Sequence, residues 1–295
     1  MAIRREWLAT CCKLSLNLRL NRRIFFLYPG ESGEFSVAQE QNYEEWLDNI
    51  YRAALNIADG TFIDVGANIG QTLLKIISID ARRDYLGFEP QILCCARIAQ
   101  GIMNRQLDNC RILPIGLSNK NEVLELQTRG NYTSSASAIS GFRPDHFYDN
   151  KQLIYVAHGD EIIGELQLSR IACVNIDVEG AELEVMEGLE ATFRSHTPFL
   201  VFEVLNHYLV VTQEELDDAT KQFRNARIKR MEALLRRCGY DIFNVLPDET
   251  LREVEEIIPI VSGDLRITNY IAVHRDRRGR YLAELESLSS DNFEN

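Results

Sequence analysis

The chain has 295 residues, long enough for one large α/β domain or two small ones. Its 45% hydrophobic and 26% charged residues are ordinary for a soluble globular protein, and no stretch approaches the roughly 18 uninterrupted apolar residues of a membrane span. A formal net charge of -12 argues against a broad nucleic-acid-binding surface.

Residues 1–40 are basic and irregular in pattern, and we treat them as an N-terminal extension. Lys13 interrupts the short apolar run near the start, and no small-residue cleavage site follows, so we do not expect export. The seven cysteines resemble neither a disulfide framework nor a C-x-x-C zinc site. Reduced, mostly buried thiols in a cytoplasmic protein are therefore expected.

Apolar residues spaced three and four apart predict helices, and short apolar runs between turn signals predict strands. In chain order the pattern predicts a helix over 43–58, a strand over 62–65, a helix over 69–77, a strand over 85–88, a helix over 92–107, a strand over 111–117 with a hairpin partner at 123–127, a helix over 161–166, a strand over 171–176, a helix over 181–193, a strand over 199–202, a helix over 214–237, and strands over 240–246 and 267–274.

Strands that alternate with helices predict an α/β, Rossmann-like fold with a mostly parallel sheet and helices on both faces. The last two strands have no helix between them, which predicts an antiparallel edge. Residues 128–150 form a polar, Ser-rich loop that is either functional or a plain surface insertion. The acidic segment 282–295 is predicted to be a disordered tail.

The turn after the first core strand carries the clearest chemical signal. Asp64 ends the strand, and Gly66, Asn68 and Gly70 follow with a spacing that lacks the G-x-G-x-x-G of dinucleotide binders. Glycine permits positive φ and a close approach of the backbone to a ligand. An acid beside the turn suits the sulfonium and ammonium groups of S-adenosylmethionine better than a pyrophosphate.

Acids end or nearly end four of the predicted strands, at Asp64, Glu89, Asp177 and Glu203. Ligands of open α/β sheets bind beyond the carboxyl ends of the strands, so these acids predict a crevice that favours cations. Glu89 ends the strand after Asp64, where a carboxylate can accept both hydroxyls of a ribose. A solvated cap is the alternative for Glu89.

Asp177 and Glu179 straddle the junction between the fourth strand and the following helix. For methyl transfer to a hydroxyl, a carboxylate in reach can act as general base, or several can hold a divalent ion. Asp177 is the first candidate for either role and Glu179 the second. His158 and His207 are weaker candidates for the base. Glu182 can equally be explained as an acid that only stabilises the dipole at the helix N-terminus.

Four motifs together resemble the FkbM family of S-adenosylmethionine-dependent methyltransferases. They are Asp64–Gly70, Phe88–Pro90, Ile176–Glu182 and Pro198–Glu203. The resemblance covers roughly residues 60–205 and implies the seven-stranded class I methyltransferase fold, in a domain that we expect over 41–281. It implies that Asp64, Gly66, Asn68 and Gly70 bind the methionine part of the cofactor, that Glu89 binds its ribose, and that the acceptor is a hydroxyl of a sugar, glycan or polyketide product.

One position departs from the family. Members commonly carry a lysine two positions before the aspartate of the fourth-strand motif, and here that residue is Asn175. The departure puts the acceptor chemistry in doubt rather than the cofactor site. Two alternatives stay open. The strand–turn–helix and Glu89 permit a nicotinamide-dependent oxidoreductase of Rossmann type, and Asn175 in place of lysine supports a non-catalytic member that binds the cofactor or a partner.

Overall fold

The computed structural model describes residues 27–29, 35–37, 44–128, 136–139, 148–204, 218–258 and 264–291. The strands of the central sheet are β3 (Thr61–Val65), β4 (Tyr85–Phe88), β5 (Cys110–Leu113), β9 (Ile171–Ile176), β10 (Phe199–Glu203), β11 (Tyr240–Val245), β12 (Leu251–Glu253) and β13 (Asn269–His274). Their order across the sheet is β12-β11-β13-β10-β9-β3-β4-β5.

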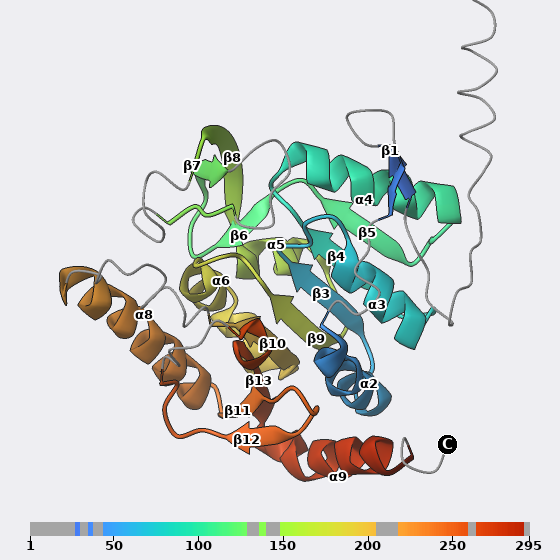
Figure 1. The fold of residues 1–295 in the computed structure, drawn as a ribbon, viewed down its shortest axis with the longest axis vertical. Helices are drawn as coiled ribbons and strands as arrows, with labels where there is room; N and C mark the ends of the chain where they lie inside the picture. The colour runs from blue at the N-terminus through green and yellow to red at the C-terminus, as the bar shows by residue number, and fades with distance from the viewer. Residues whose placement is uncertain are drawn as a thin grey trace, which may run out of the picture.

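The central sheet is mostly parallel, as predicted. Strands β10, β9, β3, β4 and β5 run parallel to one another, while β13, β11 and β12 add an antiparallel edge. Strand β3 lies between β9 and β4, so its carboxyl end is flanked on both sides (Figure 1). The predicted α/β fold is thereby confirmed, with the short strand β12 as an additional edge.

Helices cover both faces of this sheet. One face packs against α2 (Asp48–Ile57), α3 (Gln71–Ile79), α4 (Ile92–Arg105) and α9 (Arg275–Asp291). The other packs against α5 (Gly159–Leu166), α6 (Glu182–Gly188), α7 (Glu190–His196) and α8 (Asp218–Arg237). Short 3-10 helices occur at η1 (Glu45–Leu47) and η4 (Leu265–Ile267).

Alternation along β3 divides its side chains between two hydrophobic clusters. Phe62 belongs to the cluster on the α2 and α3 side, and Ile63 and Val65 belong to the cluster on the α6 and α8 side. Successive residues of a strand point to opposite faces, so Asp64 shares the face of Phe62. All five residues of this strand are buried, which fixes the position of the turn that follows.

A second, three-stranded sheet differs from the prediction. Strands β6 (Gly116–Ser118), β7 (Glu122–Thr128) and β8 (Asn150–His158) form it in the order β6-β8-β7. The predicted strand over 111–117 is split between the two sheets, and β7 pairs with β8 instead of forming the predicted hairpin. The sequence pattern missed β8 because its partner lies on the far side of a long loop.

The C-terminal region also differs from the prediction. Residues 282–291, expected to be disordered, continue helix α9 as far as Asp291. Tyr281 and Leu285 are buried, four positions apart on one helix face, and the Tyr281 hydroxyl donates to the carbonyl of Ile50 at 3.2 Å. Helix α9 lies beside α2 (Figure 1). The apolar side chains of this face pack in the same hydrophobic cluster as those of α2, despite the acidic composition.

Within the predicted N-terminal extension, β1 (Leu27–Pro29) pairs antiparallel with β2 (Phe35–Val37). The described part of the chain contains five cysteines, all buried and free, as expected for reduced thiols. No helix in the described ranges is long and apolar enough to cross a membrane. The cytoplasmic location predicted from the sequence stays a prediction.

Candidate functional site

Two turns meet at the carboxyl ends of β3 and β9. The first holds three residues in the left-handed region, Gly66 at φ 90°, Asn68 at φ 47° and Gly70 at φ 91°. The second holds Glu179 at φ 54° and Gly180 at φ 108°. A positive φ strains a non-glycine residue such as Asn68 or Glu179. Strain of this kind concentrates where a ligand is held, so both turns mark this edge of the sheet as a candidate site.

Gly66 is the point where the two turns touch. Its amide donates to the carbonyl of Phe88 at 2.9 Å, and the amide of Asp177 donates to the carbonyl of Val65 at 3.0 Å. A Cβ built on Gly66 would lie 1.8 Å from the carbonyl oxygen of Asp177. The close approach therefore requires glycine for space as well as for φ.

We expect Gly66→Ala to lower the free energy of unfolding by about 3 kcal/mol, because it adds both the clash and an unfavourable φ. Urea denaturation followed by circular dichroism measures the change. Gly164→Ala is the matched control, since a Cβ there meets no atom within 4 Å. An unfolding midpoint of Gly66→Ala equal to that of the wild type would contradict this account of the turn.

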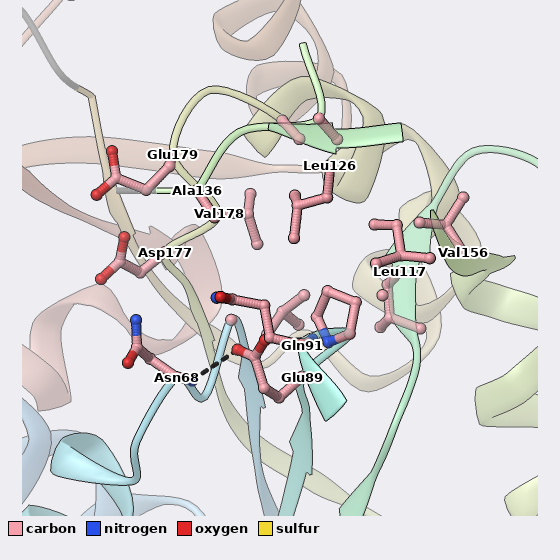
Figure 2. Close-up of a pocket in the computed structure, with 17 residues that line it drawn as sticks. Asn68, Glu89, Gln91, Leu117, Leu126, Ala136, Val156, Asp177, Val178 and Glu179 are labelled. Atoms are coloured by element: carbon pink, nitrogen blue, oxygen red, sulfur yellow. Dashed lines mark hydrogen bonds between the residues drawn. The ribbon is translucent and has the colours of Figure 1, made fainter. Parts of the chain in front are cut away.

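A cavity opens between these turns and the small sheet. Its lining residues are Val65, Gly66, Asn68, Glu89, Pro90, Gln91, Gly116, Leu117, Leu126, Ala136, Ala138, Ile154, Val156, Asp177, Val178, Glu179 and Ala181. Figure 2 shows one end lined by the carboxylates of Asp177 and Glu179, and the opposite end lined by Leu117 and Val156. The cavity thus has a polar end and an apolar end, joined by Glu89 and Gln91.

Glu89 is held rigidly at the middle of the cavity. Its Oε2 accepts the amide of Asn68 at 2.8 Å, and its Oε1 accepts the amide of Gln91 at 2.7 Å (Figure 2). The side chain is 3% exposed, and burial raises its pKa to about 7 although both amides act to lower it. The side chain of Gln91 also hydrogen-bonds to this carboxylate and lowers its pKa. A carboxylate has about four acceptor sites, so hydroxyls of a ligand would take the one that is left and the one that the Gln91 side chain occupies.

The polar end of the cavity is strongly acidic. Burial and the neighbouring carboxylates of Glu203, Glu179 and Glu44 raise the pKa of Asp177 well above its usual value. The pKa of Glu203 is raised in the same way, although its Oε1 accepts the hydroxyl of Thr268 at 2.7 Å. A positively charged ligand at this end would relieve the repulsion between these groups.

Asp64 lies beneath the first turn rather than in the cavity. Its side chain is 0% exposed, and neither Asp64 nor Gly70 is among the described residues that line the cavity. Asp64 accepts hydrogen bonds from the hydroxyl of Tyr85 and, at 2.9 Å, from Nδ2 of Asn175. The sequence placed Asp64 at the cavity surface, but side-chain alternation along β3 turns it toward α2.

Asn175 contacts Asp64, and this changes what its departure from the family affects. The two residues are register partners on β9 and β3, and Oδ1 of Asn175 accepts the hydroxyl of Tyr51 at 2.8 Å. The sequence interpretation assigned this position to the acceptor chemistry of Asp177. In the structure the side chain of Asn175 instead hydrogen-bonds to Asp64, which lies beneath the first turn.

The remaining candidates are structural or lie elsewhere. Oε1 of Glu182 accepts the amide of Gly180 at 3.0 Å, which fits the predicted role at a helix N-terminus. His158 is not among the described lining residues, and His207 lies outside the described residues. Within the described ranges, no group of three or more His, Cys, Asp or Glu side chains is arranged to hold a metal ion.

Sequence reasoning missed two parts of the site. The apolar wall comes mainly from β7 and β8, through Leu126, Ile154 and Val156, and from Ala136 and Ala138 of the predicted loop. The only signal in the sequence was the unexplained length of that loop. The second missed part is Glu44, whose carboxylate raises the pKa of Asp177. No local pattern in the sequence distinguished this residue.

The family model described as "Methyltransferase FkbM domain" matches residues 64–242. The AMB antimetabolite synthetase AmbE of Pseudomonas aeruginosa is 27% identical over 243 residues, which cover 69% of this chain and 11% of that protein. The chain therefore spans only a small part of the length of that relative.

Two solved structures are also among the matches to this chain. The methyltransferase FkbM of Methylobacillus flagellatus KT gives a TM-score of 0.44 at 14% identity, covering 75% of this chain and 46% of that one. Fibrillarin of Aeropyrum pernix, solved with natively bound S-adenosyl-L-methionine, gives 0.39 at 12% identity, covering 86% and 96%.

Proposed function

The chain belongs to the FkbM methyltransferase family and is an S-adenosylmethionine-dependent methyltransferase, and we propose that it methylates a hydroxyl of a sugar, glycan or polyketide-like small molecule. The family match over 64–242 spans both turns of the site. It favours methyl transfer over the nicotinamide-dependent alternative, in agreement with the missing third glycine of the first turn.

The cavity fits the cofactor at both ends. The apolar wall of Leu117, Leu126 and Val156 suits a flat adenine ring, because ligand pockets are mostly apolar with a few fixed polar groups. Glu89 stands between this wall and the first turn, where its buried oxygens can accept the two ribose hydroxyls. We therefore assign adenine to the apolar end and the ribose to Glu89.

The methionine part then extends to the polar end. Gly66, Asn68 and Gly70 shape the turn there, and the carboxylates of Asp177 and Glu179 complement the ammonium and sulfonium charges. Asp64 contributes its negative charge from beneath the turn rather than by contact. The acidic, partly buried end of the cavity is the observation that supports this placement, because it favours a ligand with two cationic groups.

When bound, S-adenosylmethionine supplies an electrophilic methyl carbon on a sulfonium. Asp177 lies at the same cavity end and is assigned as the base that accepts the proton of the acceptor hydroxyl. The raised pKa of Asp177 makes its ionised form a stronger base than an exposed aspartate. Glu179 lies beside it and is assigned to orienting the acceptor hydroxyl.

Two measurements on the wild-type protein test the proposal. Calorimetry is expected to show that S-adenosylmethionine and S-adenosylhomocysteine each bind at one site. Incubation with methyl-labelled cofactor and a fractionated extract, followed by mass spectrometry, is expected to yield a product labelled on oxygen. Label on nitrogen or carbon would overturn the hydroxyl assignment, and no binding of either ligand would overturn the cofactor site.

A further inference from the structure

A continuous chain of hydrogen bonds crosses the sheet face beneath the first turn. The Tyr51 hydroxyl donates to Oδ1 of Asn175 at 2.8 Å, and Nδ2 of Asn175 donates to Oδ1 of Asp64 at 2.9 Å. The Tyr85 hydroxyl donates to the other oxygen of Asp64. The four side chains come from α2, β9, β3 and β4, so the chain ties one helix to three adjacent strands.

All four side chains of this hydrogen-bond chain are buried inside the protein. Tyr51 and Tyr85 are each 1% exposed, Asn175 is 6% exposed and Asp64 is 0% exposed. Buried polar groups are costly unless they are paired, and here each named bond links one donor to one acceptor. The hydrogen-bond chain therefore fixes the position of the Asp64 carboxylate, which is not exposed to bulk solvent.

The groups that face Asp64 are neutral or acidic. Besides Tyr85 they include Glu44, Glu89 and Cys173, each of which is in electrostatic contact with Asp64. In the described part of the chain, no cation contributes to the pKa of Asp64, which burial raises to about 6 while Tyr85 and Asn175 lower it. Lys75 is paired with Asp48 at 2.9 Å and does not neutralise Asp64.

Asp64 also lies at the right place to act on the cofactor. It is two residues before Gly66, the glycine whose backbone touches the turn of Asp177. A carboxylate with two neutral donors and no cationic partner among the described residues keeps an uncompensated negative charge. That charge acts through a low-dielectric interior, where Coulomb interactions are screened less than in water.

We propose that Tyr51 and Asn175 are positioning residues that hold the charged Asp64 beneath the cofactor turn, where it favours cationic S-adenosylmethionine over its product S-adenosylhomocysteine. This inference rests on the proposed cofactor placement. The methyl donor carries a sulfonium charge that the product lacks, while both carry the same ammonium and carboxylate. The charge of Asp64 therefore discriminates donor from product and promotes product release.

The proposal predicts the ratio of the affinity for S-adenosylmethionine to the affinity for S-adenosylhomocysteine, which can be measured. At roughly 10 Å and an effective dielectric constant of roughly 35, between the values for water and for a protein interior, one charge acting on the sulfonium changes affinity by about fivefold. Asp64→Asn keeps the shape of the side chain and removes its charge. We expect this variant to lower the affinity for S-adenosylmethionine about fivefold relative to that for S-adenosylhomocysteine, as measured by calorimetry at pH 8.

Variants of the two tyrosines test the role of the hydrogen-bond chain. Tyr85→Phe removes a direct donor to Asp64, and Tyr51→Phe removes the hydroxyl that orients Asn175. Loss of a donor raises the pKa of Asp64, so the ratio of the two affinities should fall at a pH that is roughly 0.5–1 unit higher in Tyr85→Phe, with a smaller shift in Tyr51→Phe. Glu89 and Asp177 have raised pKa values too, but neither residue is changed in the tyrosine variants, so the shift relative to the wild type reports on Asp64.

Tyr281→Phe is the matched control. It removes a buried hydroxyl that also contacts helix α2, where it donates to the carbonyl of Ile50, but this hydroxyl is not part of the hydrogen-bond chain to Asp64. We expect its ratio and pH profile to match the wild type. Equal weakening of both ligands in Asp64→Asn and Tyr51→Phe would overturn the inference and leave the cofactor site intact. If Asp64→Asn does not fold, Tyr51→Phe and Tyr85→Phe decide the question. A wild type that binds neither ligand would instead overturn the proposed function.

Discussion

Replacing Glu89 by glutamine is expected to weaken the binding of S-adenosylmethionine about 100-fold. The variant keeps the size of the side chain and one oxygen for the amide of Asn68 or Gln91. It loses the negative charge that strengthens hydrogen bonds from the two ribose hydroxyls, and such bonds to a charged group contribute about 1.5–3 kcal/mol each. Isothermal titration calorimetry at pH 8 measures the change.

Glu125→Gln is the control, because Glu125 is an exposed acid of β7 that pairs with Lys151. It should bind the cofactor like the wild type. An affinity of Glu89→Gln within threefold of the wild type would remove Glu89 from the ribose site. Circular dichroism of both variants separates loss of binding from loss of folding.

The same residue predicts a pH dependence of cofactor binding. Burial raises the pKa of Glu89 to about 7, and only its ionised form accepts both ribose hydroxyls. Affinity is therefore expected to be full above pH 8 and to fall about tenfold per pH unit below 7, because the free protein must first release a proton. Glu89→Gln should lose this slope, and an unchanged slope in that variant would assign the titration to another group.

Replacing Asp177 by asparagine is expected to reduce methyl transfer about 1000-fold while cofactor affinity changes by less than tenfold. The substitution removes the base but keeps the shape of the side chain, and general base catalysis contributes roughly 100- to 10,000-fold. It also removes the carboxylate whose pKa is raised by burial and by Glu203, so the fold should be no less stable.

Single-turnover transfer of labelled methyl to the product identified in the extract measures the rate. Glu253→Gln is the control, since Glu253 is an exposed acid that pairs with Arg278. A rate within tenfold of the wild type would show that Asp177 is not the base. Equal losses of rate in Asp177→Asn and Glu179→Gln would instead assign proton acceptance to the pair.

Local patterns in the sequence were sufficient for most of the parallel sheet. The apolar runs of β3, β4, β9 and β10 are buried over nearly their whole length, so hydrophobicity and length located each of them. The pattern failed where pairing is long-range, as in β7 and β8, whose strands are separated by the loop after Thr128. It also failed at α9, where a few buried side chains outweigh an acidic composition.

The sequence by itself determined that acids stand at the ends of consecutive strands and that the first turn needs residues with positive φ. It did so because both properties depend on neighbours along the chain. Only the tertiary structure decided that Glu89 and Asp177 line one cavity while Asp64 lies beneath it. A strand presents alternate residues to opposite faces, and which face meets the cavity depends on the helices packed against the sheet. For the same reason, only the fold could bring Tyr51 and Asn175 to Asp64.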